Sequence, residues 1–322
     1  SGTGEGGTGC AISADLLGSL AFRYLRWSLG LGAFGTPKGL DARLRARLFQ
    51  DLDRSPSVDF VVLYAHDKVY DTSGSLRQDL TQLHTPNDYV LTLAREHPKI
   101  LPAASVHPDR ADALDELERA AEAGAVLMKW LPNSQGMDPA DRKHRRFYEA
   151  LARLGLPLVA HTGGEHTVAI RWPEYTDPAR LELALDCGVT VIAAHCATKS
   201  GIVDPEYYGT FAALARRYPG CYGDTAAIGT PGRFRHIPRL LADQGVLAKT
   251  VHGSDYPIPV SAWWGLGRIP LAEIRRIQGV PSTLERDVRI KRAAGMPEAH
   301  FRTLAGLLPK RAWEKKGLAP PS

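Results

Sequence analysis

The chain has 322 residues, of which 44% are hydrophobic and 23% charged, a balance that is ordinary for a globular protein. Its formal net charge of +5 is small and no basic run alternates with aromatic residues, so we expect a small and possibly anionic substrate rather than a nucleic acid. No apolar stretch reaches the ~20 residues of a membrane span, and the four cysteines lack zinc-knuckle spacing, so we expect no membrane partner and a cytoplasmic protein with reduced thiols.

The first 57 residues lack the pattern of a strand. They contain no valine and a single isoleucine, Ile12, although β-branched residues are the ones that strands favour. A glycine-rich opening, 1–9, is followed by two predicted helices, at 13–29 and 41–53. We therefore expect this segment to be loop and helix, placed before the second strand of the fold.

From residue 58 onward, predicted strands alternate with predicted helices. Near-continuous apolar runs are typical of buried parallel strands, and Pro just inside a helix start marks several of the helices. The expected strands are 59–65, 100–106, 125–131, 156–161, 189–195, 221–226 and 247–252. The expected helices between them are 86–96, 109–123, 139–154, 178–187, 205–217 and 235–244. This alternation predicts βαβ units and a parallel sheet.

The predicted fold class is α/β, a (β/α)₈ TIM barrel that forms one domain over residues 1–322. The polar residues that end the strands recur roughly every 30 residues, as in such a barrel. However, only seven strands can be counted, and a seven-stranded parallel sheet leaves two open edges in the core. We expect either a first strand upstream of residue 1, which we favour, or an irregular element that closes the barrel. Residues 282–322 are expected to supply closing helices, at 284–294 and 297–307, and a tail.

Metal-binding side chains end several of the predicted strands. His161 ends the run Leu156-Pro-Leu-Val-Ala, His195 ends Val189-Thr-Val-Ile-Ala-Ala, and Asp255 follows Thr250-Val-His-Gly-Ser. Each histidine alone is better explained by a hydrogen bond at the start of a loop. Because the carboxyl ends of barrel strands converge on one mouth, the joint pattern favours a shared site. Two imidazoles and a carboxylate suit Zn²⁺ or a similar divalent metal, with a position open for water.

Lys129 ends a further apolar run, Ala125-Val-Leu-Met. A protonated lysine cannot be a metal ligand, because an ammonium group has no lone pair to offer. Lys129 could bind an anionic group of the substrate, react with CO₂ to form a carbamate that bridges two metals, or be neutralised by a nearby acid. Around the same mouth we expect substrate contacts from His66, Trp130, Glu165 and Tyr256, although each alone is more often a hydrogen-bond partner in a loop.

Three of these segments carry a resemblance to a known family. The segments Leu-Pro-Leu-Val-Ala-His161-Thr, Val-Ile-Ala-Ala-His195 and His-Gly-Ser-Asp255-Tyr-Pro resemble the amidohydrolase superfamily, in particular its amidohydrolase-related branch (amidohydrolase 2) of TIM-barrel metal-dependent hydrolases. The resemblance spans about residues 58–310. It implies that His161, His195 and Asp255 bind a metal, and that Asp255 also takes a proton from the attacking water.

The resemblance also sets alternatives for the individual residues. Lys129 matches the position of a carboxylated, bridging lysine in binuclear members, whereas in mononuclear relatives His195 acts on the substrate as an acid or electrophile. The sequence departs from the family in one respect, because the His-x-His pair of the family's first strand occurs nowhere in it.

The leading functional expectation is hydrolysis of a small amide, lactone or ester by a protein that holds one or two metal ions, most naturally zinc. The first alternative is a metal-dependent non-oxidative decarboxylase of a small carboxylate. A carbamate at Lys129 with two metals favours hydrolysis, and a free Lys129 with one metal favours decarboxylation. The second alternative is a metal-free barrel that serves as a binding scaffold. The helix around 23–27 and the Trp263-Trp264 loop could form a lid or a contact in a homo-oligomer.

Overall fold

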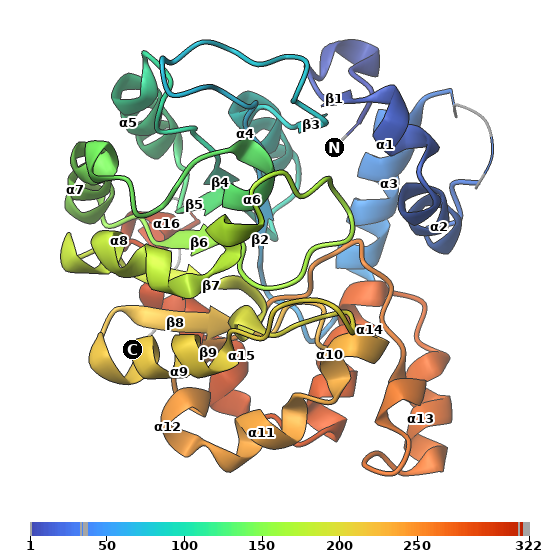
Figure 1. The fold of residues 1–322 in the computed structure, drawn as a ribbon. Coiled ribbons are helices and arrows are strands. Elements are labelled where there is room, and N and C mark those ends of the chain that lie inside the picture. The colour runs from blue at the N-terminus through green and yellow to red at the C-terminus, as the bar shows by residue number, and fades with distance from the viewer. Residues whose placement is uncertain (1, 33, 35–37, 315, 318–322) are drawn as a thin grey trace.

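A single curled sheet of seven parallel strands forms the centre of the molecule (Figure 1). The computed structural model describes residues 2–32, 34, 38–314 and 316–317. The strands follow the order β2 (Val61–Tyr64), β4 (Ile100–Ala104), β5 (Leu127–Trp130), β6 (Leu158–Ala160), β7 (Val191–Ala193), β8 (Cys221–Asp224) and β9 (Thr250–Val251). Every neighbouring pair is parallel, so the predicted βαβ organisation is confirmed.

Helices cover the outer side of this sheet (Figure 1). The longer helices are α2 (Leu20–Ser28), α3 (Leu40–Asp53), α4 (Asn87–Glu96), α5 (Ala113–Ala123), α7 (Arg145–Leu154), α9 (Tyr208–Arg217), α13 (Leu271–Gln278), α14 (Thr283–Ala293) and α15 (Glu298–Leu307). The shorter ones are α1 (Ala14–Gly18), α6 (Pro132–Gln135), α8 (Glu182–Asp186), α10 (Pro231–Phe234), α11 (Ile237–Ala242), α12 (Gln244–Leu247) and α16 (Arg311–Glu314). Short 3-10 turns lie at η1 (Glu5–Gly7), η2 (Arg142–His144), η3 (Pro173–Thr176), η4 (Pro178–Leu181), η5 (Ala194–Ala197) and η6 (Ala262–Gly265). No helix within the described ranges is both long and apolar enough to cross a membrane.

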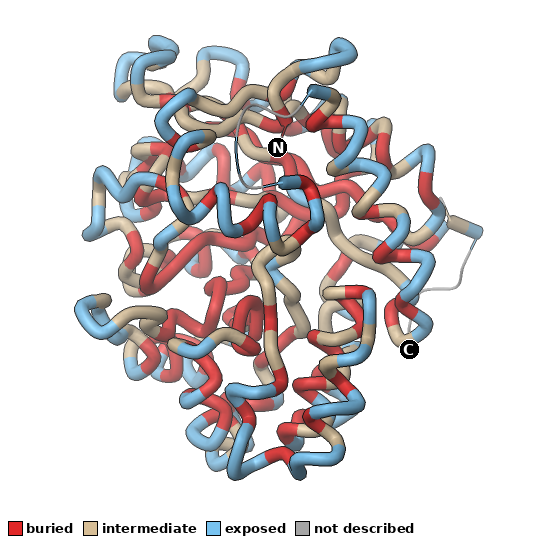
Figure 2. The backbone as a smooth tube through the Cα atoms, turned by 90° about the vertical axis from the view of Figure 1, so that its right-hand side faces the viewer, coloured by how far each residue is buried: buried red, intermediate tan, exposed pale blue. Residues whose placement is uncertain are grey.

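Side chains alternate between two apolar layers along the strands, since successive residues of a strand point to opposite faces. One layer lies inside the curled sheet and includes Leu127, Val159 and Ile192, with Trp313 of α16 at the floor. The other layer lies between the sheet and the helices and includes Met128, and it is the larger of the two. Figure 2 shows the buried residues gathered in the interior and the exposed ones on the outer helices and loops.

The N-terminal segment differs from the sequence expectation in two ways. It does contain a strand, because β1 (Ala11–Ile12) pairs antiparallel with β3 (Leu83–His84), away from the barrel sheet. This strand has only two residues, so its composition carried almost no signal. The single helix expected at 13–29 is divided into α1 and α2 by Ser19, which has an extended backbone and whose hydroxyl accepts a hydrogen bond from the amide of Phe22. Serine is a preferred residue for starting a helix in this manner.

The barrel sheet is open along one side. The outer strands β2 and β9 have no hydrogen-bonded neighbour on their free edges among the described strands. All five residues of β4 are buried, whereas none of the four residues of β2 is. The count of seven barrel strands is therefore confirmed, and the two open edges lie next to partly exposed apolar side chains.

Candidate active site

His161 directly follows β6 and its ring is buried. Its Nε2 is also buried and has no hydrogen-bond partner among the described residues. Its Nδ1 lies 3.6 Å from a carboxylate oxygen of Glu165, whose other oxygen accepts a hydrogen bond from the amide of His166 at 2.8 Å. Burial lowers the pKa of His161 to about 4, against the opposing effect of Glu165. The ring is therefore neutral at pH 7, with a nitrogen lone pair available for a ligand.

His195 lies two residues beyond the end of β7, in η5. It and the next two residues have left-handed backbones, with φ of 59°, 50° and 53°, which is costly for residues other than glycine. Asp224, at the end of β8, holds this turn, because one carboxylate oxygen accepts from the amides of His195 at 2.7 Å and Ala226 at 2.9 Å. The His195 Nδ1 donates to the carbonyl of Ala226 at 3.0 Å, since a carbonyl can only accept. Nε2 is therefore left with a lone pair.

The two imidazoles belong to the same site. Their ring centroids are 5.2 Å apart, at an interplanar angle of 69°. Burial lowers the pKa of His195 well below its usual value, and the nearby Arg233 and His161 add to this effect. The structure thus brings together the two histidines that the sequence placed at neighbouring strand ends.

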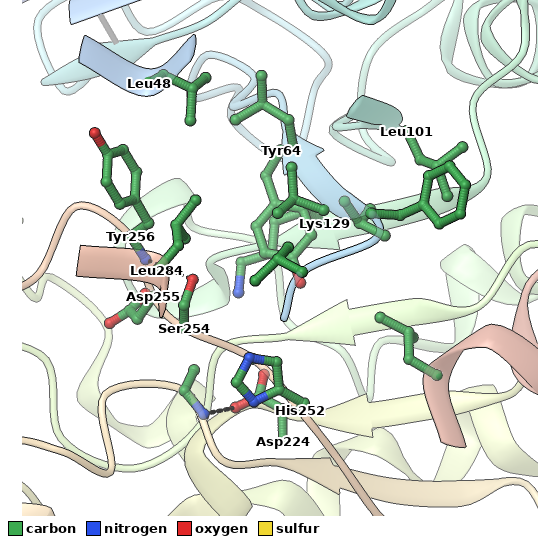
Figure 3. Close-up of a pocket in the computed structure, with 18 of the residues that line it drawn as sticks. Leu48, Tyr64, Leu101, Lys129, Asp224, His252, Ser254, Asp255, Tyr256 and Leu284 are labelled. Carbon is green, nitrogen blue, oxygen red and sulfur yellow. Dashed lines mark hydrogen bonds between the residues drawn. The ribbon is translucent and has the colours of Figure 1, made fainter. Parts of the chain in front are cut away.

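Asp255 and Lys129 border one large cavity on the inner side of the sheet (Figure 3). The cavity has a volume of about 790 Å³, and His195, Asp224 and Tyr256 also line it. Asp255 has a left-handed φ of 59° in the turn after β9. Its side chain is exposed because it faces the open cavity, whose walls surround it. Burial raises the pKa of Asp255 to about 6, and Glu165 adds to the rise. Because β5 continues to Trp130, Lys129 lies within a strand rather than at its end.

Lys129 points inward from β5 toward these acidic groups. Its Nζ lies 5.3 Å from the centroid of the Tyr64 ring, close enough for a cation–π contact. Burial lowers the pKa of Lys129, while the negative charges of Asp224 and Asp255 act in the opposite direction. Within this cavity the basic group of Lys129 therefore lies near the carboxylates of Asp224 and Asp255.

A buried ion pair supports the turn that carries Asp255. Lys291 on α14 is fully buried, and its Nζ donates to the carbonyl of Gly253 at 2.7 Å and to a carboxylate oxygen of Asp287 at 2.6 Å. The same Nζ lies 3.4 Å from Nδ1 of His252. These contacts tie the chain between β9 and Asp255 to the helical layer. The position of Asp255 thus depends on a helix about 30 residues further along the chain.

Comparison with known families decides the identity of the chain. A family model described as amidohydrolase matches residues 42–291, which is more than half of the sequence. The chain belongs to the amidohydrolase family. A search of curated proteins finds no match. The expected resemblance is confirmed, and the matched range includes every strand of the open barrel.

Solved structures similar to this amidohydrolase share its fold at low sequence identity. An uncharacterised TIM-barrel protein from Bordetella bronchiseptica is 15% identical, with a TM-score of 0.54 over 92% of this chain and 90% of that chain. A dihydroxybenzoic acid decarboxylase from Polaromonas sp. JS666, with bound manganese and 2-nitroresorcinol, is 14% identical, with a TM-score of 0.50 over 88% and 92%. A probable 2-pyrone-4,6-dicarboxylic acid hydrolase from Acinetobacter baumannii is 16% identical, with a TM-score of 0.47 over 78% and 88%. The TIM-barrel fold is thereby established, and the similar proteins include both hydrolases and decarboxylases.

The donor groups at this site are of the types that bind a divalent metal, but too few of them lie close enough together to hold one. A buried imidazole nitrogen without a partner, a second neutral imidazole and a carboxylate are the donors that such ions take. However, no group of three or more His, Cys, Asp or Glu side chains in the described part of the chain is placed to hold a metal ion. The described donors therefore do not by themselves form a complete metal site.

Arg233 on α10 is a charged residue of this region that the sequence did not indicate. It is only 7% exposed, and it donates through one terminal nitrogen to the carbonyl of Gly164 at 2.7 Å. Its Nε is buried without a partner among the described residues. Its charge acts on Asp255, Glu165 and both imidazoles. The arginine belongs to the four-residue helix α10 in the segment after β8, where no periodic pattern or motif marks it.

The residues expected to contact a substrate lie in different places. Tyr256 lines the large cavity, and Glu165 lies beside His161. Trp130 instead faces the helices: it is 0% exposed, donates through its indole N–H to the carbonyl of Val106, and packs on Phe147.

His66 also lies away from the large cavity. It borders a separate small pocket and is not among the residues that line the cavity. The side-chain alternation of β5, which directs Lys129 inward, directs Trp130 outward. Trp130 therefore does not line the cavity that contains Lys129, contrary to expectation, whereas a substrate contact by His66 stays a prediction.

Proposed function

We propose that this amidohydrolase is a metal-dependent hydrolase of a small amide, lactone or ester that carries an anionic group. The observation that carries the proposal is the unpartnered, buried Nε2 of His161, next to His195 and at the same end of the barrel as Asp255. His161 and His195, with Asp255 as a third ligand that has to approach them, are the residues that would hold the ion, which we propose to be zinc. A bound divalent metal supplies Lewis acidity, which polarises a carbonyl and lowers the pKa of water.

The other roles belong to groups of this chain. Asp255 borders the cavity and accepts the proton of the attacking water. Lys129 points into the same cavity, where its ammonium group binds the anionic group of the substrate. Tyr256 lines the cavity beside Asp255 and limits the size of the substrate. Asp224 holds the His195 turn through two amide hydrogen bonds and so positions the imidazole.

A second candidate is a metal-dependent non-oxidative decarboxylase of a small carboxylate. The position of Lys129 favours it to the same degree, because a cation in the cavity can orient a carboxylate that is to be lost as CO₂. One similar structure, at a TM-score of 0.50, is that of a dihydroxybenzoic acid decarboxylase with manganese bound. The two candidates share the site and differ in the bond that breaks.

The experiment begins with metal analysis of the chain after chelation and reloading with zinc or manganese. His161→Asn is compared with the matched control His97→Asn, which alters a buried histidine that pairs with Asp53 next to α4. We expect about one equivalent of metal in the parent and in the control, and a loss of at least half of it in His161→Asn. Less than about 0.2 equivalents in the parent would overturn the proposal.

Activity then distinguishes the two candidates. The reloaded protein is assayed with small carboxylated lactones and esters for proton release, with carboxylated amides for release of the amine, and with hydroxybenzoates for CO₂ release. Metal-dependent release of protons from the esters or lactones, or of amine from the amides, without CO₂ supports hydrolysis. Metal-dependent CO₂ release supports the second candidate and overturns the first.

A further inference from the structure

One helix of the outer layer, α2, is apolar on two opposite faces. Phe22 and Leu25 on its inner face are buried, whereas Leu20, Tyr24 and Trp27 are 82%, 56% and 63% exposed. Residues three and four apart lie on the same side of a helix, so the three exposed residues form one continuous outward stripe. A helix that is apolar all round is normally covered on both sides. The outward stripe of α2 therefore calls for a partner surface.

A second group of exposed apolar side chains lies near this stripe. Trp263 and Trp264 of η6 are exposed, and so is Leu266, which directly follows η6. The apolar cluster beneath α2 has Ile258 at its border, and the four residues from there to η6 span at most ~14 Å. Figure 1 shows α2 on the same side of the molecule as α13, which contacts η6. We call these exposed residues the aromatic face: Leu20, Tyr24, Trp27, Trp263, Trp264 and Leu266.

The charged residues within the aromatic face are all basic. The segments 20–28 and 261–272 contain Arg23, Arg26 and Arg268, and neither contains an aspartate or a glutamate. Arg23 and Arg268 are exposed, and Arg23 lies within one turn of each residue of the α2 stripe. A second copy docked on this face would bring like charges together, because a two-fold interface uses the same patch twice. An anionic partner surface is complementary to the face instead.

The residue types and the shape of the face favour lipid as that partner. The rings of Tyr24 and Trp27 are stacked with their centroids 5.9 Å apart, and both side chains combine an apolar body with a polar group. Such side chains are enriched at the boundary between lipid headgroups and acyl chains. Figure 1 shows α2 at the outer edge of the molecule, where a helix can lie against a planar surface. An interfacial helix lies in this manner, with its apolar side chains ~5–10 Å deep and its arginines at the headgroups.

We propose that the aromatic face docks on an anionic lipid surface, with the α2 stripe inserted among the headgroups and Arg23 in contact with their negative charges. Peripheral binding needs no membrane-spanning segment, and the expectation of no membrane partner was based on the absence of such a segment. The aromatic face adjoins the active-site cavity, because Tyr256 lines the cavity and also packs against the cluster beneath α2. The inference is independent of which reaction the site performs.

The test measures sedimentation of the full chain with vesicles of phosphatidylcholine alone or with about 30% phosphatidylserine. We expect the partition coefficient to be at least roughly tenfold higher with phosphatidylserine. The double variant Leu20→Ser with Trp27→Ser should lose at least roughly tenfold of this binding, because two inserted apolar side chains are removed. The matched control, Leu114→Ser with Ile202→Ser, alters exposed apolar residues of other segments and should stay within roughly twofold of the parent. Failure of the parent to bind, or equal binding by the two double variants, would overturn the proposal.

A charge variant and a measurement of mass distinguish lipid from a second copy of the chain. Arg23→Gln should weaken binding to the phosphatidylserine vesicles by roughly fivefold. The control Arg153→Gln, on α7 at the opposite side of the molecule in Figure 1, should leave it unchanged. Sedimentation velocity without lipid then reports the oligomeric state. A dimer that dissociates in the Leu20→Ser, Trp27→Ser protein, together with no vesicle binding by the parent, would assign the aromatic face to a second copy and overturn the proposal.

Discussion

Asp224 provides a quantitative test of how the fold holds His195. Its carboxylate is 5% exposed and accepts two backbone hydrogen bonds, from His195 at 2.7 Å and from Ala226 at 2.9 Å. In Asp224→Ala both N–H groups lose their acceptor, and each buried, unpaired amide costs about 1–3 kcal/mol. We therefore expect the free energy of unfolding to fall by ~2–6 kcal/mol, a large part of the ~5–15 kcal/mol of a typical domain.

The reference variants separate the hydrogen bonds from the charge. In Asp224→Asn the amide oxygen can still accept, so the loss should be about half of that in Asp224→Ala. Asp79→Ala removes an exposed carboxylate that pairs with Arg77, and it should leave the free energy of unfolding nearly unchanged because solvent screens the pair. Urea denaturation at pH 7 measures all three. An Asp224→Ala protein within ~0.5 kcal/mol of the parent would refute the reasoning, because the left-handed turn at His195 would then stand without its acceptor.

Three further outcomes are expected. Trp130→Ala should lower the free energy of unfolding by ~3–5 kcal/mol in urea denaturation. It should leave the KM for any substrate unchanged, because the ring faces the helices. A tenfold rise in KM would contradict this position of the ring. Lys291→Met leaves the Asp287 carboxyl buried without its lysine partner and should lower the free energy of unfolding by ~3–5 kcal/mol. The double variant Lys291→Met with Asp287→Leu should lower it by less, because no unpaired carboxyl remains. Equal decreases in the two variants would show that the ion pair is not the cause. Burial lowers the pKa of His300 to about 3, so the folded protein keeps this ring neutral while the unfolded chain protonates it near pH 6.5. The stability from this residue is complete above about pH 6.5 and falls by at most ~1.4 kcal/mol per pH unit as the pH is lowered toward 3. Denaturation midpoints of the parent and of His300→Gln between pH 7 and 4 measure this slope, and identical slopes would contradict the assignment.

The sequence by itself determined the arrangement of strands and the residues at their ends. Runs such as 189–195 are apolar on both faces, which only a strand buried between two layers requires, so the parallel sheet could be predicted from local pattern. The same runs stop at His161 and His195, and the two rings do lie 5.2 Å apart. The seven strands that the described residues contribute to the barrel sheet could also be counted, because strands are local features.

Only the tertiary structure decided which way the side chains of the site point and what supports them. A shift of one residue along a strand turns a side chain to the other face, so the inward Lys129 and the outward Trp130 could not be distinguished from the run that contains both. Asp224 and Arg233 act on His195 from other parts of the chain, through contacts that leave no periodic trace in the sequence. The hydrophobic pattern of a segment reflects how that segment is buried. The composition of the site depends instead on which distant segments of the chain lie next to one another.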